Sequence, residues 1–121
     1  MSSTAVILFA HGARDPEWAR PIENIRDRLH AAGERVEIAF LESMSPSLDE
    51  TAARLAAEGV GSVTIVPLFL AQGGHLKRDL PGLVAKMRER HAGIEFRVTP
   101  ALGDAPEIVA AITEWVQRAA R

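Results

Sequence analysis

The sequence has 121 residues, a length that fits one ordinary domain and is too short for two. Hydrophobic residues make up 47% of the sequence and charged residues 25%, which excludes a disordered chain. The absence of cysteine excludes a disulfide framework and a thiolate metal site. The formal net charge of -2 excludes a strongly basic surface for nucleic acid. No apolar run is long enough to cross a membrane, and the N-terminus lacks the basic flank of a signal peptide. We therefore expect a single cytoplasmic domain over residues 1–121 that binds neither nucleic acid nor membrane.

Four apolar runs along the chain predict four β-strands. The first and third runs are almost continuously apolar, which is typical of strands buried on both faces of a parallel sheet. Charged residues alternate in the second and fourth runs, which favours the edges of a sheet. The expected strands are residues 5–9, 36–41, 63–68 and 94–98.

The first expected helix lies between the first two strands. Asp15 predicts its N-cap, and Pro16 suits the first helical position because its missing N–H has no partner there anyway. Pro21 marks either a kink or the start of the regular part of this helix. Its predicted apolar face consists of Trp18, Ile22, Ile25 and Leu29.

Three more helices are expected further along the chain. Ser47 with Glu50, and Asp104 with Glu107, have the spacing of capping boxes at the starts of the second and fourth helices. We expect the fourth helix to pack on the sheet, with an interface as the alternative use of its apolar face. The apolar positions are Leu80, Leu83, Val84 and Met87 in the third helix, and Ile108, Ile112, Trp115 and Val116 in the fourth.

A strand–helix unit repeated four times predicts an α/β fold. Right-handed crossovers turn such a chain into a three-layer sandwich, in which a four-stranded parallel sheet lies between two layers of helices. We expect the flavodoxin-like strand order 2-1-3-4, in which the first and third strands are neighbours. Ligands of such sheets bind beyond the carboxyl ends of the strands, at the point where the connections diverge.

Polar residues follow three of the strands at this edge. His11 follows the first strand, Glu42 follows the second, and His75 lies a few residues beyond the third. His11 alone is as often an ordinary polar loop residue, and Glu42 alone is a weaker signal, because a carboxylate near a helix start also stabilises the helix. Neighbouring strands are only about 4.8 Å apart, however, so all three side chains can converge. Two imidazoles and a carboxylate suit a borderline divalent metal. The other histidines, His30 and His91, stand near helix ends, where we interpret them as structural or solvated.

Several other site chemistries are absent from the sequence. It contains no phosphate-binding P-loop, no dinucleotide fingerprint after a strand and no G-x-S-x-G nucleophile elbow. A histidine phosphatase would need an arginine before its His-Gly pair, where this chain has Ala10. We therefore expect no nucleotide cofactor.

The motifs at the three strand ends resemble those of the sirohydrochlorin chelatases. They are His-Gly at residues 11–12, Phe-Leu-Glu at 40–42 with a following proline, and Pro-Leu-Phe-Leu…Gly-Gly-His…Asp-Leu-Pro at 67–81. This family consists of ATP-independent, class II chelatases that insert cobalt for cobalamin or ferrous iron for sirohaem. The resemblance covers essentially the whole chain and fits the small, single-domain members.

The resemblance implies an enzyme of the lyase class, a sirohydrochlorin cobaltochelatase or ferrochelatase. His11 and His75 match the two motif histidines, which act as metal ligands and as bases for the pyrrole protons, and Glu42 matches a third catalytic residue. The substrates would be a sirohydrochlorin-type tetrapyrrole and Co2+ or Fe2+, with Ni2+ as a further candidate. Ala13 replaces a serine that is frequent in the family, so any hydroxyl role there is lost.

A site that binds a tetrapyrrole with many carboxylates should contain basic side chains. Arg14, Lys77 and Arg78 flank the two histidines, and we predict that they bind the tetrapyrrole carboxylates. A single-domain chain would have to form the family's cleft as a homodimer, between its subunits. The alternatives are a non-catalytic metal- or tetrapyrrole-binding carrier module, and a regulatory subunit that binds neither.

Overall fold

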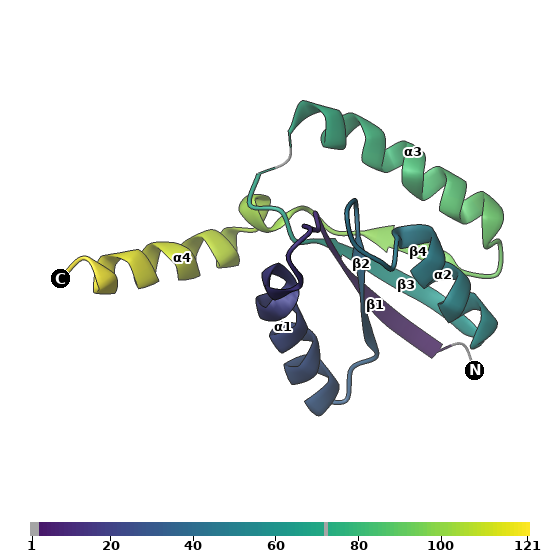
Figure 1. Ribbon diagram of the computed structural model, residues 1–121, viewed down its shortest axis with the longest axis horizontal. Helices are drawn as coiled ribbons and strands as arrows, with labels where there is room; N and C mark the ends of the chain where they lie inside the picture. The colour runs from purple at the N-terminus through teal and green to yellow at the C-terminus, as the bar shows by residue number, and fades with distance from the viewer. Residues whose placement is uncertain (1–2, 72) are drawn as a thin grey trace.

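Four parallel strands form the centre of the molecule (Figure 1). This computed structural model describes residues 3–71 and 73–121, apart from the side chain of His75. The sheet order is β2-β1-β3-β4, which confirms the predicted topology. The strands are β1 (Ser3–Ala10), β2 (Val36–Phe40), β3 (Val60–Pro67) and β4 (Glu95–Val98).

Helices lie on both faces of this sheet, so the predicted three-layer arrangement is confirmed. α1 covers β1 and β2 on one face, whereas α2 and α3 cover the other face (Figure 1). None of the helices in the described part of the chain is long and apolar enough to span a membrane. The helices are α1 (Arg20–Ala31), α2 (Leu48–Ala57), α3 (Gly74–Arg90) and α4 (Pro106–Ala119), with short 3-10 turns η1 (Pro16–Ala19) and η2 (Leu102–Asp104).

The core has two parts, one on each face of the sheet. Successive side chains of a strand point to opposite faces, so Ile7 and Phe9 of β1 pack with α2 and α3, whereas Leu8 packs with α1. β1 is therefore buried on both faces, as predicted. β3 is not: Val63 belongs to the buried core, but Val66 on the α1 side is only half-buried, because α1 does not extend over β3.

The starts of α1 and α2 follow their sequence signals. The Asp15 carboxylate accepts a hydrogen bond from the Glu17 backbone N–H at 3.0 Å and caps η1. The regular helix begins at Arg20, so Pro21 stands in its first turn and marks its true start. At α2, Ser47 and Glu50 form the predicted capping box in both directions.

The start and the packing of α4 were predicted wrongly. Asp104 ends η2, so the N-cap of α4 is Ala105 and no capping box forms with Glu107. The helix does not pack on the sheet. None of its residues is buried, and Trp115 is 63% exposed. Figure 1 shows α4 extending away from the other elements, because the chain turns outward after η2.

Candidate functional site

His11 and Glu42 lie side by side where β1 and β2 end. The pairing of these strands continues beyond them: the Leu41 N–H donates to the Ala10 carbonyl at 2.8 Å, and the Glu42 N–H donates to the His11 carbonyl at 2.9 Å. These backbone bonds bring His11 Nδ1 to 3.8 Å from Glu42 Oε1. Their side chains are 49% and 63% exposed, so both groups remain accessible to a ligand.

Gly12 makes this close approach possible. Its φ of +99° is a conformation that side-chain-bearing residues rarely adopt. A Cβ at this position would also lie 2.0 Å from the Glu42 carbonyl oxygen. Any other residue would therefore push the two strand ends apart, and the His-Gly pair acts as one structural unit.

The aromatic ring of Phe69 packs against the imidazole of His11. The imidazole lies 4.5 Å from the Phe69 ring, measured between centroids, with the planes tilted by 59°. Phe69 is buried and packs edge-to-face on Phe9 at 5.7 Å. Phe69 is not among the site residues predicted from the sequence, although it stands within the third motif, after β3.

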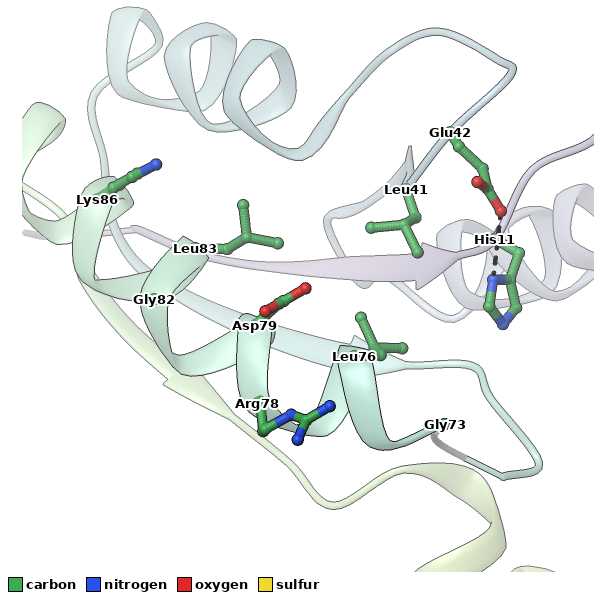
Figure 2. A pocket seen from close by; sticks show the side chains of 10 residues that line it. All are labelled: His11, Leu41, Glu42, Gly73, Leu76, Arg78, Asp79, Gly82, Leu83 and Lys86. Atoms are coloured by element: carbon green, nitrogen blue, oxygen red, sulfur yellow. Dashed lines mark ion pairs between the residues drawn. The ribbon is translucent and has the colours of Figure 1, made fainter.

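A cavity of about 660 Å³ opens between the ends of β1 and β2 and one side of α3, as far as Lys86 (Figure 2). His11 and Glu42 stand at one end of it and Lys86 at the other. Leu41 and Leu83 point into the space between them. The middle of the cavity is therefore lined by leucines with the Asp79 carboxylate among them, and a largely apolar lining with a few polar groups is typical of a small-molecule binding site.

The three basic residues predicted to bind substrate carboxylates do not line one common cavity. Arg78 lines the cavity together with His11 and Glu42. Lys77 lines a separate cavity of about 400 Å³ on the other flank of α3, and Arg14 is exposed and lines neither. Adjacent helix positions differ by about 100° around the axis, which places Lys77 and Arg78 on different sides.

The backbone of His75 lies in the first turn of α3, between Gly73 and Leu76, which both line the cavity. Its side chain lies outside the part of the chain that the structure describes. Among the described side chains, no three His, Asp or Glu residues are grouped closely enough to hold a metal ion.

Sequence reasoning missed one stripe of α3. Leu76, Asp79, Leu83 and Lys86 all line the cavity, and their spacing of three, four and three residues places them on one side of a helix. This spacing was visible in the sequence. The apolar positions Leu80, Val84 and Met87, which pack on the sheet, gave the stronger signal and concealed it.

The remaining histidines lie outside this site. His30 Nε2 is 2.7 Å from the Val36 carbonyl oxygen, and His91 Nε2 is 3.2 Å from Asp49 Oδ1. Both interactions connect neighbouring elements, in agreement with the structural interpretation of these two residues.

The cavity lining carries two cations, Arg78 and Lys86, and two carboxylates, Glu42 and Asp79. Arg78 and Lys86 can pair with carboxylates of a ligand, and the leucines can contact an apolar ring. The imidazole of His11 and the carboxylate of Glu42 are ligand types that borderline divalent metals prefer.

The sequence matches one protein family over almost its whole length. The pattern of the CbiX family matches residues 5–119. The sirohydrochlorin cobaltochelatase of Sulfurisphaera tokodaii is 32% identical over 116 residues, which cover 96% of this chain and 93% of that protein. The similarity therefore includes all the strand ends described above.

Solved structures show the same fold. A CbiX protein of Marinobacter aquaeolei VT8, ascribed to cobalamin (vitamin B12) biosynthesis, superimposes with a TM-score of 0.84 at 34% identity and covers 95% of both chains. The sirohydrochlorin chelatase SirB of Bacillus subtilis subspecies spizizenii, in complex with cobalt, gives a TM-score of 0.78 at 23% identity. That match covers 96% of this chain but 50% of SirB, so this chain corresponds in fold to about half of that protein.

Proposed function

Because the chain belongs to the CbiX family, we propose that it is a chelatase that inserts a divalent metal into sirohydrochlorin without ATP. The sirohydrochlorin cobaltochelatase that matches almost all of its length supports this substrate. The observation that carries the proposal is the His11–Glu42 pair, which stands exposed at one end of a cavity lined by three leucines. That arrangement fits a macrocycle held beside a metal.

The reaction sets clear requirements for the side chains. The metal must be held loosely enough to be handed over, and two pyrrole N–H protons must be removed. A neutral imidazole can bind a metal and can accept a proton at neutral pH. We assign both tasks to His11 and His75, with Glu42 as the third catalytic residue. The assignment of His75 is supported by the Gly-Gly-His motif and by its backbone position beside the cavity.

The macrocycle would lie along the cavity, between His11 and Lys86. Leu41, Leu76 and Leu83 would contact its ring, because they line the middle of the cavity. Arg78 and Lys86 would pair with its carboxylates. Arg14 and Lys77 remain predicted carboxylate ligands, and they would need a substrate that reaches beyond this cavity.

The metal and the assembly complete the proposal. Co2+ is supported by the cobaltochelatase relative, and Fe2+ and Ni2+ suit the same imidazole and carboxylate ligands. The chemistry places the enzyme in the lyase class. We also propose one domain over residues 1–121, a homodimer with the substrate cleft between its subunits, and a cytoplasmic location.

Anaerobic insertion of Co2+ or Fe2+ into sirohydrochlorin tests this function. The visible absorption change is followed with protein well below the substrate concentration, for wild type and His75→Ala. We expect turnover above the spontaneous rate, and a loss of at least about tenfold in His75→Ala. His30→Ala, which removes an imidazole far from the cavity, should keep the wild-type rate.

Each other outcome has a defined meaning. Unchanged turnover in His75→Ala would remove His75 from the reaction. A shifted spectrum of bound sirohydrochlorin without turnover would indicate the carrier module in place of the enzyme. No interaction with metal or macrocycle would leave the regulatory subunit.

A further inference from the structure

The orientation of the His11 ring is not fixed by its charged neighbour. The side chain of His11 is about half exposed, and an exposed side chain changes its rotamer within nanoseconds. Glu42 Oε1 lies 3.8 Å from His11 Nδ1, which is longer than a hydrogen bond. The carboxylate therefore attracts the imidazole without setting its direction. Another contact has to hold the ring.

Phe69 supplies that contact. Its ring lies 4.5 Å from the imidazole between centroids, with the planes tilted by 59°, which is the separation of rings in van der Waals contact. The two rings come from different strand ends, because His11 follows β1 and Phe69 follows β3. Rotation of the His11 side chain to another rotamer would give up this packing.

The ring of Phe69 is itself held firmly. It is only 2% exposed and packs edge-to-face on Phe9 at 5.7 Å. The backbone is tied on both sides: the Leu68 N–H donates to the Phe9 carbonyl at 2.7 Å, and the Gly103 N–H donates to the Phe69 carbonyl at 3.3 Å. β1 and η2 therefore fix the place of this ring.

The neighbours of Phe69 in the chain do not share its burial. Among the described residues between β3 and α3, which are 68–71 and 73, Phe69 alone is buried. Leu70, the next residue, is 67% exposed, and its carbonyl oxygen would lie 1.5 Å from a Cβ at Gly103. The chain thus turns outward directly after Phe69, and one aromatic side chain of this segment reaches back under His11.

The direction of the His11 ring decides what its second nitrogen can reach. Figure 2 shows Nδ1 on the side of Glu42 and Nε2 pointing away from that carboxylate. Nε2 is therefore the nitrogen that can face a metal or a pyrrole N–H. A displacement of about 1 Å of a reacting group can cost on the order of a hundredfold in rate. The surface on which the ring rests is thus part of what makes His11 effective.

We infer that Phe69 is a positioning residue, whose buried ring holds the His11 imidazole so that Nε2 faces the metal and the macrocycle. This inference rests on the proposed function for the role of His11, and it deepens that function by adding a residue that acts through His11. Phe69 is not one of the residues that line the cavity, so it has no direct part in binding the macrocycle.

The kinetics of Phe69→Leu test the inference against a purely structural role. We expect kcat for metal insertion to fall by about tenfold or more, while KM for sirohydrochlorin stays within about twofold. Phe96→Leu is the matched control, because Phe96 is buried in the same core cluster but stands in β4. It should keep both constants. An unchanged kcat in Phe69→Leu, or an equal loss in both variants, would overturn the inference.

Co2+ binding tests the same contact without sirohydrochlorin. Calorimetric titration compares wild type, Phe69→Leu, His11→Ala and the double variant. We expect Phe69→Leu to weaken Co2+ binding by about three- to tenfold in wild type and not at all in His11→Ala, because Phe69 acts through His11. The same loss in both backgrounds would show that Phe69 acts through the fold in general, which would overturn the inference.

Circular dichroism shows whether each variant is folded. Phe69→Met, which keeps more of the side-chain volume, takes the place of Phe69→Leu in both experiments if the leucine variant is unfolded. A methionine also lacks the flat ring, so the same losses of kcat and of Co2+ affinity are expected. Wild-type values of both in a folded Phe69→Met would overturn the inference.

The two experiments separate this inference from the proposed function. A chain that binds Co2+ with the expected dependence on Phe69 and His11 but does not insert it into sirohydrochlorin would contradict the chelatase and support the positioning role. An active chelatase in which Phe69→Leu behaves as wild type would do the reverse.

Discussion

The two halves of the sheet differ in how much of their surface the chain itself covers. Around β1 and β2, helices pack on both faces, and the strand ends are joined by backbone hydrogen bonds that place His11 beside Glu42. Around β3 and β4, only the α3 face is covered, and the helix that could close the other face points outward. The closed half therefore positions chemical groups, whereas the open half offers surface to another molecule.

The largest difference between the two halves is expected in the unfolding free energy, when apolar side chains on the α1 face of the sheet are replaced by alanine. Leu8→Ala, under α1, should cost about 2–5 kcal/mol of unfolding free energy, because it leaves a cavity in a closed core. Val66→Ala, on the part of this face that α1 leaves uncovered, should cost under about 1 kcal/mol in dilute protein. Urea unfolding at low protein concentration measures both values. Equal losses would mean that this part of the face is covered within a single chain.

Gly12→Ala should damage the closed half next most strongly. A left-handed φ and a Cβ 2.0 Å from the Glu42 carbonyl oxygen predict a loss of about 1–3 kcal/mol and separation of His11 from Glu42. Metal insertion should fall with it, by about tenfold or more. Urea unfolding and the insertion assay test the two effects separately. Ala13→Gly, one residue further on, serves as the control and should retain activity.

Gly103→Ala should damage the open half with a different outcome. Overpacking against the Leu70 carbonyl predicts a similar loss of about 1–3 kcal/mol, together with a redirected α4. Cobalt binding to the variant, followed by calorimetric titration, should weaken as well, because Gly103 contacts Phe69, whose ring lies 4.5 Å from that of His11. Unchanged cobalt binding would show that the contact of Phe69 with His11 does not contribute to holding the metal.

The smallest expected effect is on substrate binding, when a lysine is removed from one side of α3 or from the other. Lys86→Ala should raise KM for sirohydrochlorin by about five- to tenfold while kcat changes little, because Lys86 lines the cavity far from His11. Lys77→Ala removes the same charge on the other flank and should have the weaker effect. Steady-state kinetics of the two variants decides between the flanks. A larger effect at Lys77 would place the macrocycle outside the cavity described here.

Local patterns predicted more of the closed half than of the open half. The continuous apolar run of β1 indicated burial on both faces, and the capping box at Ser47 marked the start of α2. The open half misled the same reasoning. The apolar run of β3 and the apolar spacing of α4 also indicated burial, but Val66 is only half-buried and Trp115 is exposed. A periodic pattern identifies an apolar face without identifying what covers it.

By itself, the sequence determined the strands and the residues that follow them, because apolar periodicity depends on local stereochemistry. The strand order was expected from the fold class with right-handed connections, and the structure confirmed it. The sequence therefore predicted that His11 and Glu42 would meet. Only the tertiary structure decided how they meet, because the close approach depends on Gly12 and the His11 ring packs on Phe69. The tertiary structure alone also placed Arg78 and Lys77 in different cavities and directed α4 away from the sheet. These features depend on contacts between segments far apart in the chain, which no local pattern encodes.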